Sequence, residues 1–258
     1  MKEFLTDELK DFLENKYNQY SRPGFIETDP ISIPHLFTKK QDMEIAGFLA
    51  ATISWGQRKT ILKNARQLLH WMDDAPHDFI LNFRKDDLKP FRKFVHRTFN
   101  GTDCIYFLNA LQHLYKNSGG LQQLFEKPFT EKQDLSYAIS MARKKFFQLR
   151  HPARTLKHFP DPAAGSAAKR INMFLRWMVR KDFSGIDFGI WKKIKPADLV
   201  CPLDVHSARV ARKLGLLSRK QNDWAAANEL TNNLRKLDKN DPVKYDLALF
   251  GLGVFEKF

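Results

Sequence analysis

Cysteine and long apolar runs are scarce in this sequence, and each scarcity excludes a class of protein. The chain of 258 residues has two cysteines, Cys104 and Cys201, which cannot by themselves complete a multi-cysteine zinc or iron–sulfur site or a disulfide framework. This usage fits a reducing cytoplasm. The best apolar stretch, Ile45–Trp55, contains Thr52 and Ser54 and is shorter than the roughly 18 residues that span a bilayer. We therefore expect a cytoplasmic protein without a bound metal, a cofactor or a membrane segment.

Acidic side chains are in the minority. Lys and Arg total 43 against 29 Asp and Glu, which gives a net charge of +14. This excess favours a polyanionic partner, with nucleic acid ahead of an anionic membrane surface. A solvated basic surface without a partner is the alternative. The N-terminal segment MKEFLTDELK turns acidic where a signal peptide would be apolar. Hydrophobic residues make up 43% of the chain, so a packed core is expected.

Strand-like alternation and internal repeats are missing, whereas helical periodicity runs through most of the chain. The pattern predicts an all-α fold of roughly ten to twelve helices. Residues 25–40 are predicted to form a connection with at most a short helical turn. The predicted helices begin near Thr6 or Asp7, cover Gln41–Trp55, Arg58–Met72 and Pro76–Phe83, and begin again near Leu121, Lys132, Lys169, Asp204 and Asp241. Two more are predicted to have Thr102 and Asp223 as their N-terminal caps.

The strongest functional signals lie in the segment from Gly165 to Leu216. Lys169 follows Gly165 and Ser166, which are typical of the approach to a helix. Asp204 precedes an amphipathic run and is expected to cap it. Lys169 and Asp204 would then lie near helix N-termini, where backbone N–H groups can meet an anion. A lysine, a carboxylate and an anion site can together act on a phosphate-bearing substrate.

These two residue types also indicate a reaction. As a neutral amine, Lys169 can attack a sugar carbon and form a Schiff base, and the adjacent Arg170 disfavours the protonated ammonium. Asp204 can stabilise the oxocarbenium ion through which a glycosidic bond breaks. The alternatives are a solvated helix lysine and a carboxylate that serves only as an N-cap. His206 is more consistent with a structural role than with proton transfer.

A second signal lies between the predicted helices 41–55 and 58–72. Their link is short, so they are expected to form a hairpin with Gln57 at its tip. Gln57, beside Arg58, is suited to fill the gap that a turned-out base leaves in a duplex, or it is simply a loop amide. Trp55 fits a core role better than a stacking role. The basic and aromatic segment 84–97 is either a solvated face or a phosphate track.

Three segments carry a family likeness. P-L-D-V-H-S-A-R-V-A-R-K-L-G-L, which contains Asp204, is similar to P-x-D-T-H-V-x-R-V-x-x-R-L-G-L. G-S-A-A-K, which ends at Lys169, matches the spacing G-x-G-x-K, and A-T-I-S-W-G-Q, which ends at Gln57, is similar to a helix end that reads L-S-A-Q. Together they resemble the helix-hairpin-helix (HhH-GPD) DNA glycosylase superfamily, which includes endonuclease III and the 8-oxoguanine glycosylases, and indicate a bacterial branch of it. The hairpin departs from the family pattern L-P-G-x-G and keeps one glycine, Gly165.

The resemblance implies two α-helical lobes, residues 1–40 with 205–258 and residues 41–204, with a divergent helix-hairpin-helix. It implies a monomeric glycosylase with AP lyase activity that repairs double-stranded DNA at the bacterial nucleoid. The spacing of Lys169 and Asp204 is closer to that of archaeal 8-oxoguanine glycosylases than to that of endonuclease III, which favours oxidised guanine as the lesion. Lys169 and Asp204 would be catalytic, and the DNA-binding residues would be Gln57, Arg58, Gly165, Ser166, Arg170 and His206.

Two other classes of protein stay open at this point. A non-catalytic DNA- or RNA-binding protein would keep the glycosylase fold without its chemistry. A basic structural protein would act through protein partners and show no salt-dependent affinity for DNA. The placement of Lys169 and Asp204 distinguishes the glycosylase from the non-catalytic binding protein, because only the enzyme needs both side chains at one site.

Overall fold

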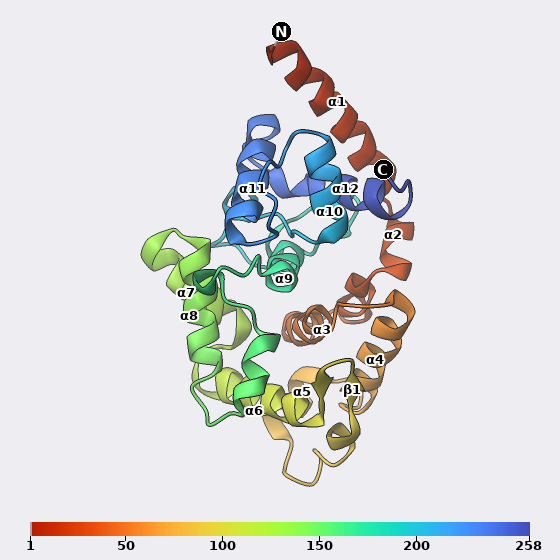
Figure 1. Cartoon of the computed structure of the whole chain (residues 1–258). Coiled ribbons are helices and arrows are strands. Elements are labelled where there is room, and N and C mark those ends of the chain that lie inside the picture. The colour runs from red at the N-terminus through yellow and green to blue at the C-terminus, as the bar shows by residue number, and fades with distance from the viewer. Residues whose placement is uncertain (1) are drawn as a thin grey trace. The chain divides into compact units, whose positions relative to one another are not determined.

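The computed structural model describes residues 2–258 of the chain, and side chains from residue 7 onward. The chain forms two compact units: Met1–Phe25 with Asp161–Phe258, called here the terminal unit, and Ile26–Pro160, the middle unit. In the described part, twelve α-helices and a single two-stranded ribbon make up the regular structure, together with short 3₁₀ turns (Figure 1). The expected all-α architecture is confirmed.

The middle unit is organised around α3 (Lys40–Thr52), which is buried from Glu44 to Thr52 as its apolar sequence predicts. Phe48 on this helix is fully buried, and its ring centroid lies 5.5–6.0 Å from three other Phe rings of the core. Such a cluster of rings supplies much of the apolar area buried in this unit. The other elements are α4 (Arg58–His70), α5 (Pro76–Asn82), β1 (Val95–His96), β2 (Phe99–Asn100), α6 (Gly101–Asn117), α7 (Gly120–Lys132) and α8 (Leu135–Phe146).

Two local predictions in the middle unit are wrong. The cap of α6 is Asn100 and not Thr102, because the Asn100 side-chain oxygen accepts hydrogen bonds from the N–H groups of Thr102 and Asp103. The strands β1 and β2, which no sequence pattern indicated, form an antiparallel pair with Val95 opposite Asn100. Their tight turn contains Arg97 with a φ of 51°, where glycine or asparagine would normally mark a hairpin.

In the terminal unit, α1 and α10 pack against α12. Helix α1 begins at Lys2, ahead of the predicted start at Thr6 or Asp7. Helix α9 is buried from Ile171 to its end at Val179, although this stretch includes Arg176. The elements of this unit are α1 (Lys2–Tyr20), α9 (Lys169–Val179), α10 (Val205–Lys213), α11 (Trp224–Leu237) and α12 (Tyr245–Val254), and α2 (Pro23–Thr28) contains the boundary with the middle unit.

The two units divide the chain at other points than the predicted lobes, which were residues 1–40 with 205–258 and residues 41–204. The main difference is that α9, and with it the segment from Asp161 to Asp204, belongs with the chain ends. Arg176 of α9 pairs with Asp246, and Arg180 pairs with Asp241, so ion pairs tie α9 to the C-terminal segment. Met1, which the predicted lobe includes, lies outside the described residues.

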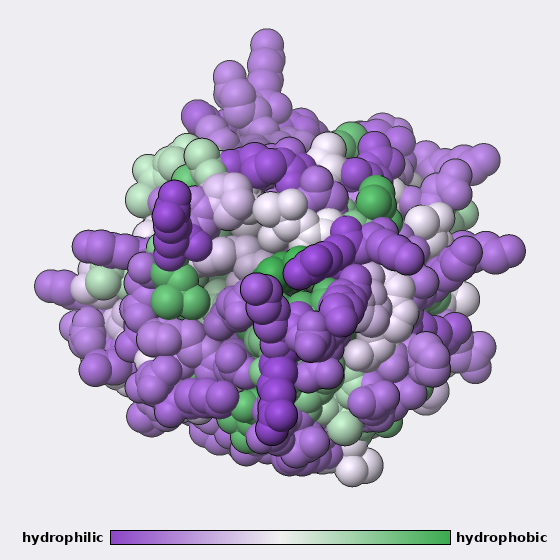
Figure 2. Space-filling view, turned by 90° about the horizontal axis from the view of Figure 1, so that it is seen from below, coloured by the Kyte–Doolittle hydropathy of each residue, from purple (hydrophilic) through white to green (hydrophobic). Residues whose placement is uncertain are grey.

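The face shown in Figure 2 is covered mainly by hydrophilic side chains, with hydrophobic ones in small, scattered groups. Isolated apolar side chains of this kind are normal on a folded protein. No helix within residues 2–258 is both long and apolar enough to cross a membrane. Among the side chains from residue 7 onward, the large hydrophobic ones that are exposed include Leu36, Val95, Phe183, Val205 and Phe255.

Candidate active site

Lys169 and Asp204 lie next to each other in the terminal unit. Lys169 is the first residue of α9, and Asp204 is the N-cap of α10. The Lys169 Nζ atom is 3.7 Å from Asp204 Oδ2, and the two side chains are 29% and 26% exposed. The partial exposure leaves both groups accessible to a substrate. Because both residues stand at helix N-termini, backbone N–H groups of two helices lie beside the pair.

Asp204 divides its two carboxylate oxygens between the helix and the pair. Oδ1 accepts hydrogen bonds from the backbone N–H groups of His206 (2.9 Å) and Ser207 (3.0 Å), while Oδ2 faces Lys169. Burial alone raises the pKa of Asp204, but Lys169 and the two N–H groups outweigh burial and hold this pKa below its usual range. Asp204 is therefore a carboxylate at neutral pH, and it is held in one orientation by α10.

The turn before α9 is fixed by contacts with the start of α11. Gly165 has a φ of 84°, which glycine adopts without strain, and its carbonyl accepts a hydrogen bond from the Trp224 N–H (3.0 Å). Ser166 forms a β-bridge with Asp223, and its Oγ accepts a hydrogen bond from the Ala168 N–H (3.2 Å). Gly165 and Ser166 thus position the first residue of α9. Contact of these two residues with DNA stays a prediction.

Two further predicted DNA-binding residues adjoin the pair. His206 is exposed in the first turn of α10, and its charge contributes to the low pKa of Asp204. Arg170 follows Lys169 but is half-buried, and burial lowers the pKa of its guanidinium to about 10. Arg170 is therefore less accessible to a phosphate than His206.

Gln57 and Arg58 belong to the middle unit, whereas Lys169 and Asp204 belong to the terminal unit. Gln57 is exposed at the N-cap of α4, so its amide is accessible from solvent. Arg58 is half-buried, and its Nη2 lies 3.6 Å from Asp29 Oδ2, so its charge is shared with a carboxylate. The roles of both residues toward DNA stay predictions.

The aromatic and basic segments of the middle unit agree with their predicted environments. Trp55 is half-buried, and its ring centroid lies 5.0 Å from that of His96 and 6.0 Å from that of His158, so its ring packs on the middle unit without being fully enclosed. In the segment 84–97 the Lys and Arg side chains are exposed, while Phe91 and Phe94 are buried. This exposure fits both a solvated face and a phosphate track, so the two alternatives for this segment stay predictions.

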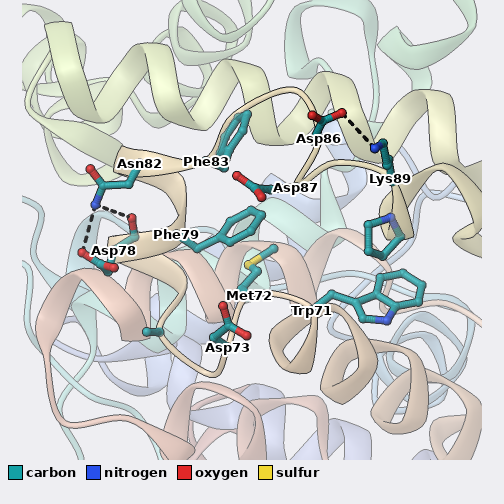
Figure 3. A pocket seen from close by; sticks show the side chains of 12 residues that line it. Trp71, Met72, Asp73, Asp78, Phe79, Asn82, Phe83, Asp86, Asp87 and Lys89 are labelled. Atoms are coloured by element: carbon teal, nitrogen blue, oxygen red, sulfur yellow. Dashed lines mark hydrogen bonds and ion pairs between the residues drawn. The ribbon is translucent and has the colours of Figure 1, made fainter.

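A pocket of about 580 Å³ in the middle unit has the wrong charge for DNA (Figure 3). Its lining brings together four aspartates, and the one lysine of the lining, Lys89, pairs with Asp86 at 3.0 Å. Negative side chains repel phosphates, so this pocket is not a candidate nucleic-acid site. The residues that line it are Trp71, Met72, Asp73, Ala75, Asp78, Phe79, Asn82, Phe83, Asp86, Asp87, Lys89 and Pro90.

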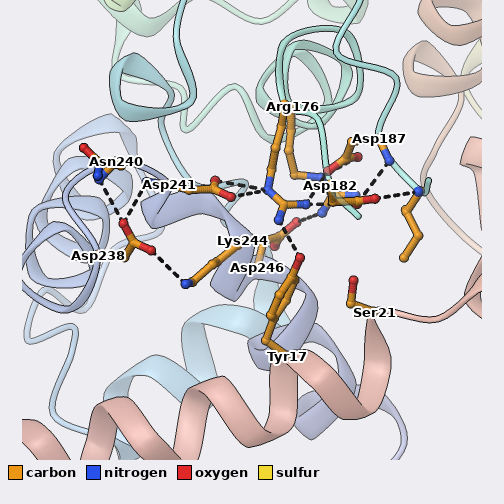
Figure 4. Close-up of polar contacts among 12 residues, drawn as sticks. Tyr17, Ser21, Arg176, Asp182, Asp187, Asp238, Asn240, Asp241, Lys244 and Asp246 are labelled. Atoms are coloured by element: carbon orange, nitrogen blue, oxygen red, sulfur yellow. Dashed lines mark hydrogen bonds and ion pairs between the residues drawn. The ribbon is translucent and has the colours of Figure 1, made fainter. Parts of the chain in front are cut away.

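A buried ion-pair network beside α9 escaped the sequence analysis (Figure 4). Arg176 Nε is 3.3 Å from Asp187 Oδ1, and Arg176 Nη1 donates to Asp246. Arg180 Nη1 is 3.0 Å from Asp187 Oδ2, and Arg180 Nε is 2.8 Å from Asp241 Oδ2. Because Arg176 and Asp246 are 70 residues apart, no local pattern reveals the contact. Among the side chains that the structure describes, those from residue 7 onward, no group of three or more His, Cys, Asp or Glu is arranged to hold a metal ion.

Comparison with known proteins gives a family without an assigned activity. Residues 29–255 match the model of a family described as protein of unknown function (DUF2400). The match covers most of the chain, so the chain belongs to this family. No curated protein and no solved structure matches it.

Proposed function

We propose that this member of the DUF2400 family is a DNA glycosylase with AP lyase activity, in which Lys169 is the nucleophile and Asp204 assists it. The observation that carries the proposal is the 3.7 Å separation of Lys169 Nζ and Asp204 Oδ2 in two partly exposed side chains. The likeness of the sequence around both residues to the helix-hairpin-helix glycosylases supports the same roles. Oxidised guanine is the lesion that this likeness favours.

The proposed reaction uses each group of the pair once. The ammonium of Lys169 first loses a proton to water, and the resulting neutral amine attacks C1′ of the target nucleotide, while the glycosidic bond breaks with its electron pair passing to the base. The carboxylate of Asp204 stabilises the positive charge that develops on the sugar. The amine then loses a proton and the sugar ring opens, which leaves a Schiff base on Lys169. Loss of a proton from C2′ expels the 3′ phosphate and breaks the strand.

Binding of double-stranded DNA is the first step of the proposed cycle. The net charge of +14 supports it, because lysine and arginine side chains displace counterions from phosphates. The target base has to leave the stack before C1′ can be reached. Gln57, exposed at the start of α4, is proposed to occupy the gap.

Borohydride trapping tests the proposal, because borohydride reduces a Schiff base to a stable covalent adduct. The duplexes carry 8-oxoguanine, an oxidised pyrimidine, uracil or an abasic site. We expect an adduct with wild-type protein, no adduct with Lys169→Ala, and an unchanged adduct with Lys220→Ala, which removes an exposed lysine of the same unit. Salt-sensitive DNA binding without an adduct on any duplex would contradict the catalytic proposal and favour a non-catalytic nucleic-acid-binding protein.

A further inference from the structure

An arginine stands at the tip of the β1–β2 ribbon in a backbone conformation that suits glycine. Arg97 has a φ of 51°, in the left-handed region, where the presence of a Cβ atom costs free energy. It belongs to the two-residue turn between His96 and Phe99, which are paired across the ribbon. Such turns favour glycine, asparagine or aspartate where φ is positive. Strained residues of this kind cluster at functional sites, so the conformation points to a role for the arginine side chain.

The Arg97 side chain lies against Gly56, the residue before Gln57. A Cβ atom on Gly56 would be 3.1 Å from Arg97 Nη1 and 3.2 Å from Arg97 Cδ, so the lack of a side chain at position 56 makes room for the arginine. Gly56 has a φ of 103°, which also favours glycine at this position. The Arg97 guanidinium is thereby placed beside the exposed residue that is proposed to fill the gap in the duplex, Gln57.

Strand β1 lies beside α4 (Figure 1), and the ribbon tip is tied to two other parts of the middle unit. The buried His96 ring donates through Nε2 to the Trp55 carbonyl oxygen (3.0 Å) and accepts at Nδ1 from Asn64 Nδ2 (2.9 Å). Arg154 Nη2 donates to the Thr98 carbonyl oxygen (2.8 Å). These contacts fix the backbone of the tip, so a ligand of the arginine meets a cation whose position is already set, which reduces the entropy lost on binding.

The charge of Arg97 is not neutralised within the described part of the chain. The residue is exposed, and its guanidinium forms no ion pair or hydrogen bond with residues 7–258. Arg58, on the other side of Gln57 in the sequence, differs because it shares its charge with Asp29. Arg92 and Lys93, which precede the ribbon, are exposed as well. A guanidinium binds phosphate through parallel charge-assisted hydrogen bonds, so an exposed and uncompensated arginine suits a phosphate ligand.

We propose that Arg97 binds a phosphate of duplex DNA next to the gap that Gln57 fills. This inference rests on the proposed function, because Gln57 enters the duplex only if the target base is turned out. A phosphate contact supplies affinity without reading the sequence, so the contribution of Arg97 is the same for any flanking base pairs. The contact also explains the strain, because glycine at position 97 would relax the turn but would remove the cation.

Two variants separate the charge of Arg97 from its strain. Arg97→Ala and Arg97→Gly both remove the cation, but only glycine relaxes the turn, so Arg97→Gly should have the higher midpoint in urea denaturation. Fluorescence anisotropy with a labelled abasic-site duplex should show both variants binding roughly tenfold more weakly than wild type, as expected for one hydrogen-bonded ion pair with phosphate. The slope of the logarithm of affinity against the logarithm of salt concentration should become shallower by about 0.9 in both. Neither loss should change with the sequence that flanks the abasic site.

Arg66→Ala is the matched control, because Arg66 is exposed on α4 two residues after Asn64 and therefore on another side of the helix, and it should bind like wild type. Affinities of both Arg97 variants equal to that of wild type would overturn the inference and leave the glycosylase function intact. A loss in Arg97→Ala that Arg97→Gly restores, or a loss that depends on the flanking base pairs, would also overturn it. A sequence-independent loss in both variants, together with no borohydride adduct from wild type, would refute the glycosylase function and keep the phosphate contact.

Discussion

At the scale of single residues, the candidate site depends on a carboxylate that has two roles. Asp204 caps α10 through Oδ1 and faces Lys169 through Oδ2. The cap orients the carboxylate, so no separate residue is needed to aim it. One side chain therefore serves both as the cap of α10 and as the proposed catalytic carboxylate. Substitutions at position 204 can separate the two roles.

Asp204→Asn should keep the fold and lose the chemistry. Asparagine is as good an N-cap as aspartate but carries no charge. Its free energy of unfolding is expected to fall only by the contribution of the ionised carboxylate, because the cap is kept, while adduct formation falls at least tenfold. Asp204→Ala should lose the cap as well and unfold more easily by about 1 kcal/mol. Urea denaturation and trapping on the same samples measure both effects. Equal adduct formation by Asp204→Asn and wild type would leave Asp204 as a cap only.

Two carboxyl groups of the terminal unit, those of Asp204 and Asp246, affect stability with opposite signs. Burial raises the pKa of Asp204, but Lys169 and two N–H groups lower it by more, so the net pKa is below its usual value. Ionised Asp204 therefore stabilises the fold. That contribution is present above the unfolded-state pKa of about 3.9 and is lost as the pH falls through the folded-state pKa. Burial raises the pKa of Asp246 to about 6, so the folded state holds this proton more tightly. Ionisation of Asp246 therefore lowers stability as the pH rises from about 4 to about 6.

Asp246→Asn tests this sign directly. The stability of the variant relative to wild type should increase by roughly 2–3 kcal/mol between pH 4 and pH 7, since one pKa unit corresponds to about 1.4 kcal/mol. Urea denaturation at the two pH values gives the difference. Asp86→Asn, at an exposed position of the middle unit, should show no such change. A pH-independent difference between Asp246→Asn and wild type would contradict the proposed ionisation.

At the scale of elements, predictions from sequence succeeded where the cause of the structure is local. The caps Asp204 and Asp223 are both confirmed, because each side chain bonds to N–H groups two or three residues on. The burial of α9 from Ile171 to Val179 could not be predicted, because Arg176 pairs with Asp246, which is 70 residues away in the sequence. The β1–β2 ribbon escaped notice because its turn, at Arg97, has no residue that marks a hairpin.

The turn before α9 contains a strained position that glycine should relieve. Ala168 has a φ of 47°, a left-handed conformation that costs an alanine about 1–2 kcal/mol. Ala168→Gly should therefore be more stable than Ala167→Gly by about 1 kcal/mol, since both variants lose a buried methyl group and gain the same freedom when unfolded. Urea denaturation of the two variants measures the difference. Equal stability would mean that this turn is unstrained.

At the scale of the whole molecule, the division into units was harder to predict than the helices. The predicted lobes separated Lys169 from the C-terminal segment, whereas ion pairs from Arg176 and Arg180 place α9 with α12. The pairing of Lys169 with Asp204 followed from family-like motifs, whereas the buried ion pair of Arg176 with Asp246 has no motif in the sequence. The exposed basic face of the middle unit agrees with the excess of positive charge in the sequence.

The net charge of +14 predicts how binding depends on salt. The logarithm of the affinity for duplex DNA should fall linearly with the logarithm of the salt concentration, by about 0.9 for each phosphate contact. Lys169→Ala should shift this slope by no more than about one contact, because a single charge is removed. Fluorescence anisotropy with a labelled duplex measures the slope. An affinity for duplex DNA that is the same at about 50 mM and about 200 mM salt would count against DNA as the partner.

The most direct measurement of the central claim is the identity of the residue that borohydride links to DNA. Wild-type protein would be trapped on an abasic-site duplex, digested and analysed by mass spectrometry. The account predicts that the DNA-derived mass lies on the peptide that contains Lys169, and that Lys169→Ala gives no adduct. An adduct on another amine, or none with the wild-type protein, would contradict it.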